Sequence, residues 1–385
     1  MWPPKANHEL LRDHNRRLVM KLLRDGGPMS RSELAQHTGL APSVLTRLVR
    51  RLLADGVVVE AGKRPSRGGR RATLLAVDPG YAHVVGVKVE RERVLAARVD
   101  LAGRIQGRAD VPLAAPPDPD LVLGKVVEVV GSLRTGRILG VGVAVSGLVD
   151  AARGMDLYSP ILGWHNVPVA DSLRARLRLP VWVENDVNAL TLAEQWYGAG
   201  RGYRSFVCLT VGEGIGAGLV VSGELYRGAF GGAGEVGHTT LDPQGPRCRC
   251  GQQGCLEMYA SDHALSAAAA ALGYQGIDEL AAAARAGSEP ARRAFAEMGN
   301  ALGIGAKNLV NLVNPEALVL GGERMEMADL FLPEFEDQVR QHSFPEEAKD
   351  LVVLPAELGR DGFIVGAATL GILEWYRMPT EDKVR

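Results

Sequence analysis

Three cysteines and one histidine lie close together in the chain and are of the residue types that bind metal ions. Cys248 and Cys250 are separated by one residue, Cys255 follows after four more, and His238 precedes Cys248 by ten positions. A Cys3His set is typical of structural zinc sites. A disulfide would leave one thiol over and needs an oxidising compartment, and we see no signal-peptide pattern. We therefore predict a structural Zn2+ in this loop. The alternatives are a disulfide or a reduced surface loop.

The N-terminal part of the chain is basic and the rest is acidic. The 385 residues have a formal net charge of −1, yet residues 1–75 contain fifteen Lys and Arg against six Asp and Glu. The remainder contains twenty-nine basic and thirty-nine acidic residues. This asymmetry is typical of a nucleic-acid-binding module joined to a second domain. No apolar run reaches the ~18–20 residues of a membrane helix.

Hydrophobic spacing predicts three helices in this basic head. The first covers residues 8–25, a short second helix ends at a glycine turn, and the third covers 42–56. This is the layout of a helix-turn-helix, whose second helix enters the major groove of DNA. We expect Val44, Leu48 and Leu52 to form the buried face of the third helix. Its polar face is predicted to contact DNA through Ser43, Thr46, Arg47 and Arg50.

Two β-rich runs follow the helices and predict a hairpin wing. Residues 57–60 and 72–77 flank a glycine-rich loop that carries five basic side chains. Cations on such a loop suit phosphates or the minor groove. The alternatives are solvated surface charges, or a helical bundle unrelated to DNA. The predicted DNA contacts of the wing are Arg67, Arg70 and Arg71.

From about residue 80 the pattern changes to strands alternating with helices, which predicts an α/β architecture. Several segments of this body carry a resemblance to a known family: GVGVAVSGLVD, GWHNVPV, VENDVNAL, GEGIGAGLVVSGELYRG, GEVGH and CRCGQQGCLE. Together and in this order they resemble the ROK family (repressors, open reading frames and kinases). The likeness is strongest to the branch with an N-terminal helix-turn-helix, which includes the xylose and N-acetylglucosamine repressors.

The resemblance implies a two-lobed actin-like ATPase fold with a zinc loop, placed after the winged helix-turn-helix. On this basis we expect the head to cover residues 1–78. The first lobe would cover 79–187, with a C-terminal helix at 364–385 packing back on it, and the second lobe would cover 188–363. Sugar and nucleotide meet between the lobes in kinases of the family.

The resemblance also assigns roles to polar residues of the body. Asp186 matches the catalytic base of the kinases, although a helix N-cap is an alternative role for it because a helical pattern follows directly. His238 would bind zinc through one ring nitrogen and offer the other to the sugar. The full set of implied sugar contacts is Asn166, Asn185, Asp186, Glu235, His238 and Glu257.

The chain departs from the kinases of the family where these bind phosphate. The expected motif Asp-X-Gly-Gly-Thr-Lys is replaced by KVERER at residues 88–93, with Lys88 in place of the metal-associated aspartate. The second glycine-rich turn contains Glu213 where the kinases usually have threonine. Side chains and negative charge now occupy the space that the phosphates need. We therefore predict no enzymatic activity and no catalytic residues.

These observations predict a cytoplasmic, sugar-responsive transcriptional regulator, most simply a repressor of carbohydrate-utilisation genes. Its partners would be operator DNA and a sugar effector, and it would form a homodimer or homotetramer without contacting a membrane. One alternative is a glucokinase-like sugar kinase that carries a DNA-binding head. The other is a regulator that binds no sugar and docks a partner protein instead.

Overall fold

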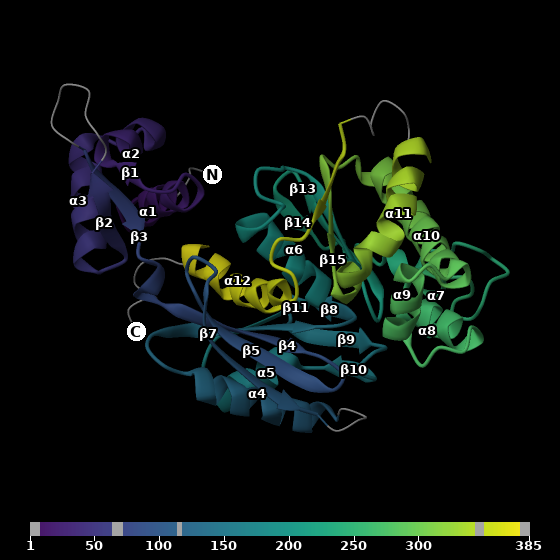
Figure 1. The fold of residues 1–385 in the computed structure, drawn as a ribbon. Helices are drawn as coiled ribbons and strands as arrows, with labels where there is room; N and C mark the ends of the chain where they lie inside the picture. The colour runs from purple at the N-terminus through teal and green to yellow at the C-terminus, as the bar shows by residue number, and fades with distance from the viewer. Residues whose placement is uncertain (1–7, 64–71, 114–117, 343–349, 378–385) are drawn as a thin grey trace, which may run out of the picture.

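The computed structural model describes residues 8–63, 72–113, 118–342 and 350–377. A small head at the N-terminus is followed by a body built on two five-stranded sheets (Figure 1). The elements of the head are α1 (His8–Asp25), β1 (Met29–Ser30), α2 (Arg31–Thr38), α3 (Pro42–Ala54), β2 (Val58–Lys63) and β3 (Thr73–Val77).

The turn between α2 and α3 has the geometry that its residues favour. Ser30 caps α2 and forms a capping box with Glu33, so two backbone N–H groups at the helix start are paired with side chains. Gly39 ends the helix in the left-handed conformation with φ 67°. Strands β2 and β3 pair antiparallel, which confirms the predicted hairpin. Strand β1 adds a third strand to it.

The buried face of α3 differs from the predicted one. Leu45, Val49 and Leu52 are buried against α1 and α2, whereas Val44 is 42% exposed and Leu48 is only partly buried. Both stripes satisfy helical spacing, because each repeats at three to four residues. Packing against the rest of the head selects between them, and the sequence pattern of the helix does not contain that information.

The first lobe of the body is built on the sheet β11-β7-β4-β5-β6. Strands β4, β7 and β11 are parallel, and β5 and β6 extend the sheet as antiparallel strands. A small sheet of β8, β9 and β10 lies beside it. The elements are η1 (Pro79–Tyr81), β4 (His83–Val89), β5 (Arg93–Asp100), β6 (Ile105–Pro112), α4 (Pro119–Leu133), β7 (Ile138–Val145), β8 (Leu148–Asp150), β9 (Met155–Ser159), β10 (Trp164–Val167), α5 (Val169–Leu177) and β11 (Val181–Asn185).

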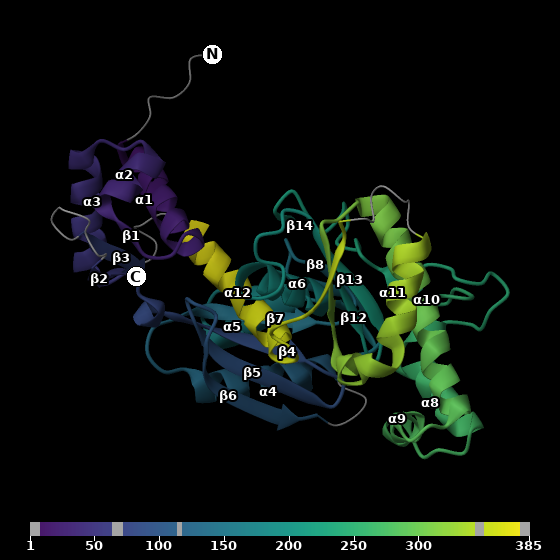
Figure 2. The same cartoon turned by 45° about the horizontal axis from the view of Figure 1, so that its top comes forward.

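The second lobe is built on the sheet β14-β13-β12-β15-β16. Its large apolar core is formed by this sheet together with helices α8 to α11, which lie at the end of the molecule away from the head (Figure 2). The elements are α6 (Asp186–Tyr197), β12 (Phe206–Val211), β13 (Ile215–Val221), β14 (Glu224–Tyr226), η2 (Val236–His238), α7 (Glu257–Ala260), α8 (Asp262–Ala271), α9 (Ile277–Arg285), α10 (Glu289–Val313), β15 (Ala317–Gly321), η3 (Glu323–Met327), α11 (Ala328–His342) and β16 (Val352–Pro355).

The last helix, α12 (Asp361–Arg377), joins all parts of the molecule. It packs on β4 and β7 of the first sheet and on α6. The contact is close because Gly142 has no side chain, and a Cβ there would lie 1.7 Å from the Ala367 carbonyl oxygen. The far end of α12 reaches α1 of the head, as both views show (Figure 1 and Figure 2). No helix in the described ranges is long and apolar enough to cross a membrane.

Candidate functional site

The four predicted metal ligands come together in one loop. Their ligand atoms all lie within 4.8 Å of one another. Cys248 Sγ is 3.6 Å from His238 Nδ1, and Cys250 Sγ is 3.7 Å from Cys255 Sγ. A disulfide has a sulfur–sulfur distance near ~2.05 Å, so the thiols are free. The donor set and its spacing fit a tetrahedral metal ion.

The surroundings of this group disfavour the charged form of its thiols. Burial, together with the neighbouring thiols, raises the pKa of Cys255 to about 12. A thiol with such a pKa stays protonated near neutral pH unless a positive charge stabilises the thiolate. Because His238 faces the group through Nδ1, its Nε2 remains available for a second interaction.

Three carboxylates lie next to the metal loop, and we call them the acid cluster: Asp186, Glu235 and Glu257. Glu257 begins α7 two residues after Cys255 and is 6% exposed, and its Oε1 lies 3.9 Å from Cys248 Sγ. Glu235 precedes η2 and interacts electrostatically with His238, Glu257 and Asp186. Three elements of the second lobe, α6, η2 and α7, therefore place three predicted sugar contacts and the metal ligand His238 near one another.

The carboxyl group of Asp186 has an unusual proton affinity. Burial raises its pKa to about 6, and the neighbouring Glu323 and Glu235 charges also raise it, while Lys88 acts in the opposite direction. Desolvation similarly raises the pKa of Glu235. Much of its carboxyl group is surrounded by protein, although the residue as a whole is exposed. Both carboxyl groups therefore hold their protons more tightly than ordinary surface acids.

The N-cap of α6 is Asn185 rather than Asp186. The Asn185 side chain accepts a hydrogen bond of 3.1 Å from the Asn188 N–H and donates one of 2.9 Å to the Gly147 carbonyl. These bonds tie Asn185 to the backbone as a structural residue. Asp186 is the first residue of the helix, and its carboxylate accepts only from the neighbouring Val187 N–H among the described hydrogen bonds.

Asn166 lies apart from this group in the hydrogen-bond network. It is an exposed residue of β10 with a left-handed backbone, φ 51°. Within the described ranges, no side-chain hydrogen bond or ion pair joins it to the acid cluster. The described interactions therefore connect Asp186, Glu235, His238 and Glu257 among the predicted sugar contacts, and the contact predicted for Asn166 stays a prediction.

The region in which the sequence departs from kinases is filled by charged side chains that pair with one another. We call Lys88, Glu90, Arg91, Glu213 and Glu323 the paired cluster. The Lys88 ammonium is 3.5 Å from Glu323 and 3.6 Å from Glu90, and it lies 3.6 Å from the centre of the Phe363 ring. Lys88 belongs to the first lobe and Glu323 to the second, so their ion pair connects the lobes.

A second set of contacts links the paired cluster to the metal loop. Arg249, which lies between two of the cysteines, is 3.3 Å from Glu257 and 3.7 Å from Glu213. Glu213 in turn is 3.8 Å from Arg91 of the first lobe. The sequence analysis missed Arg249 and Glu323. The position of Arg249 between two predicted metal ligands was the feature of the sequence that could have indicated its role. No sequence pattern indicated the pairing of Glu323 with Lys88.

The predicted DNA-binding residues of α3 share one open face of the head. Ser43, Thr46, Arg47 and Arg50 are all exposed, and together with Pro42 they line a shallow hollow of about 410 Å³. Helix α3 itself lies on the side of the head away from the body (Figure 1). The predicted wing contacts Arg67, Arg70 and Arg71 lie outside the described residues.

The sequence matches the ROK family over residues 84–373, and a winged helix-turn-helix DNA-binding pattern matches residues 12–59. The chain belongs to the ROK family. It is 30% identical to the xylose repressor of Caldicellulosiruptor bescii, an alignment that covers 97% of this chain and 99% of the relative. It is 28% identical to the transcriptional dual regulator NagC of Escherichia coli over 92% of this chain and 91% of the relative.

The structure is similar to a solved ROK regulator and, over a smaller part of the chain, to a solved ROK kinase. A ROK transcriptional regulator described as a homologue of the E. coli MLC protein superposes with a TM-score of 0.84 at 27% identity, covering 97% of this chain and 99% of that one. A ROK glucokinase from Streptomyces griseus, in complex with glucose and AMPPNP, has a TM-score of 0.67 at 33% identity. It covers 75% of this chain and 98% of its own, so the head is the part without a counterpart.

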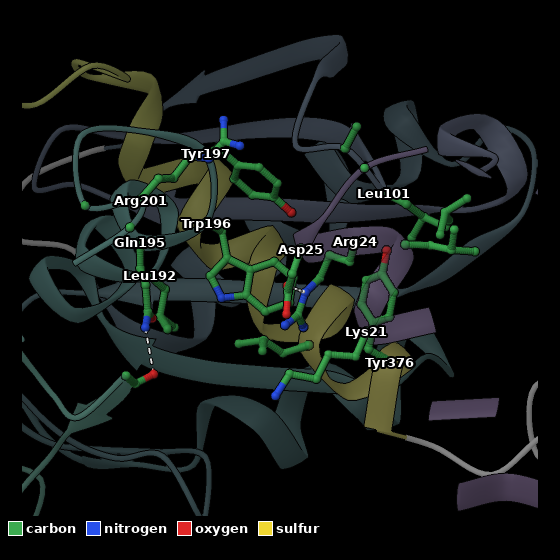
Figure 3. A pocket seen from close by; sticks show the side chains of 18 of the residues that line it. Lys21, Arg24, Asp25, Leu101, Leu192, Gln195, Trp196, Tyr197, Arg201 and Tyr376 are labelled. Carbon is green, nitrogen blue, oxygen red and sulfur yellow. Dashed lines mark hydrogen bonds and ion pairs between the residues drawn. The ribbon is translucent and has the colours of Figure 1, made fainter. Parts of the chain in front are cut away.

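In this ROK chain the head is attached to the body by aromatic and apolar contacts. Arg24 of α1 lies over the rings of Trp196 and Tyr376, with centroid distances of 4.2 and 5.4 Å (Figure 3). Residues of α1, α6 and α12 line a cavity of about 990 Å³ at this junction. Trp375 belongs to the same hydrophobic cluster as Val19 and Leu23 of the head. Helices α6 and α12 therefore contact the head directly, so that a movement of either helix would act on the head.

Proposed function

We propose that this protein is a sugar-responsive transcriptional repressor. Its head would bind operator DNA through α3, and a sugar would bind without being phosphorylated at the acid cluster. The match over nearly the whole length with two sugar repressors supports the combination of the two parts. A homodimer would place two recognition helices in successive major grooves, about 34 Å apart.

The acid cluster supports a sugar as the ligand. Carboxylates are strong hydrogen-bond acceptors, and vicinal hydroxyl groups need several acceptors close together. Asp186 and Glu235 have few partners within the protein, and His238 has a ring nitrogen that the metal would not use. A sugar that lacked one of the hydroxyl groups would leave a polar group unpaired, so the site would discriminate between sugars. Asn166 would join these contacts if β10 moves toward the ligand.

We propose Zn2+ as the metal of the Cys3His group. Zinc favours this ligand set, with Zn–S distances near ~2.3 Å. It would supply a fixed cross-link rather than a reactive site, because all four positions are taken by protein. The cross-link would hold Glu235 and Glu257 at their places on either side of the loop.

The observation that carries the choice of a regulator is the ion pair between Lys88 and Glu323. A kinase would need this space for the phosphates and the metal of ATP. Here an ammonium group with 8% exposure occupies it and is paired with carboxylates from both sides. A nucleotide would have to break these pairs and would meet Glu323 and Glu90 as like charges.

Signal transfer would run through the helices that the lobes share with the head. Asp186 begins α6, and Trp196 near the end of this helix stacks on Arg24 of the head. A sugar that favours one arrangement of α6 would therefore shift the position of the head. For this, the sugar must bind the two arrangements with different affinity, since equal affinity shifts nothing.

The experiment is a fluorescence anisotropy titration of DNA from upstream of the protein's own gene. Sugars and sugar phosphates are then added to the complex. We expect DNA binding, and a change of at least about tenfold in affinity with one of the ligands, which is a coupling of about 1.4 kcal/mol. DNA binding that no ligand alters would contradict the sugar-responsive part of the proposal.

A kinase with a DNA-binding head is the second candidate, and one observation favours it. A pKa of about 6 suits Asp186 to act as a general base near neutral pH. Incubation with ATP, Mg2+ and a panel of sugars, followed by detection of sugar phosphate, distinguishes the two. We expect no turnover above that of an Asp186→Asn variant.

A further inference from the structure

The glycine turn between β12 and β13 is already occupied by carboxylates of the protein itself. A Cβ placed on Gly212 would lie 2.1 Å from Glu323 Oε2, and one on Gly214 would lie 2.9 Å from Glu257 Oε2. Both oxygens therefore lie directly against the turn. A glycine-rich turn can receive an anion where its backbone N–H groups are free. In this protein the Gly212 N–H donates to the Gly214 carbonyl at 3.1 Å, and the carboxylates of Glu257 and Glu323 lie against the turn.

The cations beside the turn are also engaged. Lys88 interacts with Glu90, Glu323 and the Phe363 ring, and it is almost completely buried. Its ammonium would have to give up these partners to bind a ligand. Within the described ranges no other lysine contacts this group.

The nearby arginines are committed in the same way. Arg249 is shared between Glu257 and the side chain of Glu213, and it also donates a hydrogen bond of 3.1 Å to the Glu213 carbonyl. Arg91 pairs with Glu213, and Arg93 pairs with Glu90 at 3.1 Å. Each cation adjacent to the glycine turn thus has at least one carboxylate partner.

Negative charge is in excess around the place where a sugar would bind. Among the described residues, the connected group contains at least seven carboxylates and five cations: Glu90, Asp186, Glu213, Glu235, Glu257, Asp262 and Glu323 against Lys88, Arg91, Arg93, Arg249 and Arg324. A zinc ion held by three thiolates would add one further negative charge. A phosphate ester carries nearly two negative charges at pH 7 and would be repelled by this group.

We infer that the effector is a neutral, unphosphorylated sugar and that the paired cluster excludes sugar phosphates. This inference rests on the proposed function, since it assumes a sugar at the acid cluster. Hydroxyl groups donate to carboxylates, so an excess of carboxylates favours a neutral polyol. The same excess disfavours its phosphate ester. Glu323 has the central role because it pairs with Lys88, covers Gly212 and acts on Asp186.

The test compares the affinities of neutral sugars and sugar phosphates for the full chain. Isothermal titration calorimetry measures ligand binding, and fluorescence anisotropy measures the effect of each ligand on the DNA complex. The neutral probes are xylose, glucose, mannose and N-acetylglucosamine, and the charged probes are the 6-phosphates of the last three. We expect one neutral sugar to bind at least about tenfold more tightly than its phosphate ester. Tighter binding of the ester would overturn this inference and leave the regulator proposal intact. If no probe binds, the proposed function fails and the inference fails with it.

A pair of variants tests the role of Glu323. Glu323→Gln removes one negative charge and releases Lys88, so we expect the ratio of ester to neutral-sugar affinity to rise at least about tenfold. Glu326→Gln is the matched control, since Glu326 lies in the same short helix η3 but is 66% exposed and pairs with Arg360. An unchanged ratio in a Glu323→Gln protein that still binds the neutral sugar would overturn the assignment. Circular dichroism and zinc content confirm that both variants are folded.

Discussion

The acid cluster and the paired cluster are neighbours at the junction of the two lobes, yet their charges are arranged in opposite ways. In the acid cluster, Asp186 and Glu235 interact electrostatically with each other, and no ion pair to either is found among the described residues, whereas Glu257 pairs with Arg249. In the paired cluster, each charge is matched by another, as between Lys88 and Glu323. Groups without partners are available to a ligand, whereas groups that satisfy one another stabilise the protein. The comparison teaches that charged residues alone do not mark a binding site. Whether they are paired within the protein decides whether they are available to a ligand.

Disrupting the proposed metal site should have the largest effect on this contrast, because the metal loop lies next to one cluster and contacts the other through Arg249. For Cys250→Ser we expect loss of the bound metal, a decrease in the free energy of unfolding of about 3 kcal/mol or more, and loss of the sugar response. Metal analysis, urea denaturation and anisotropy measure the three quantities. Cys208→Ala is the control, since Cys208 is buried in a different core and should leave the metal content unchanged. A metal-free Cys250→Ser protein with a normal response would refute the link.

Neutralising the acid cluster should abolish recognition without affecting DNA binding. For Asp186→Asn we expect the sugar affinity to fall by about tenfold to a hundredfold, which corresponds to the loss of one charged hydrogen bond of about 1.5–3 kcal/mol. The affinity for DNA in the absence of sugar should stay within about twofold. Calorimetry and anisotropy provide the two measurements. Asp171→Asn, on an exposed residue of α5, should change neither.

Removing the cation of the paired cluster should reduce stability. Lys88→Met leaves Glu323 and Glu90 without their buried partner, and we expect a loss of about 1–2 kcal/mol in the free energy of unfolding. The comparison variant Lys125→Met removes an exposed ion pair with Glu128 and should cost less than about 0.5 kcal/mol. Equal stability of the two variants in urea would show that the Lys88 pairs do not join the lobes. Neither variant should gain kinase activity.

The smallest expected effect is a pH dependence that only the acid cluster shows. With a pKa of about 6, the Asp186 carboxyl is ionised at pH 7.5 and mostly protonated at pH 5.5. Because the ionised form is the better acceptor for a hydroxyl group, sugar affinity should decrease about fourfold as the pH falls across this range. In Asp186→Asn the same calorimetric titration should be flat. An affinity that rises toward pH 5.5 in the wild-type protein would show that the protonated carboxyl binds the sugar.

Much of this protein follows from short segments of sequence. The metal ligands and the helix-turn-helix are local patterns, and the structure confirms the helices of the head and the clustering of the four ligands. Local patterns are reliable here because their geometry depends on neighbours in the chain. Gly39 is an example, since a left-handed turn after α2 favours a residue without a side chain.

Tertiary structure alone decided the features that join distant segments. Val44 was predicted to be buried and is exposed, because two helical stripes fit the sequence of α3 equally well and only packing selects one. Asn185 rather than Asp186 caps α6, which freed the aspartate for the acid cluster. The partner of Lys88 lies 235 positions further along the chain, so no periodicity connects them. Such pairs form where two lobes that are distant in the sequence pack against each other. The residues that face each other across this contact cannot be identified from either segment alone.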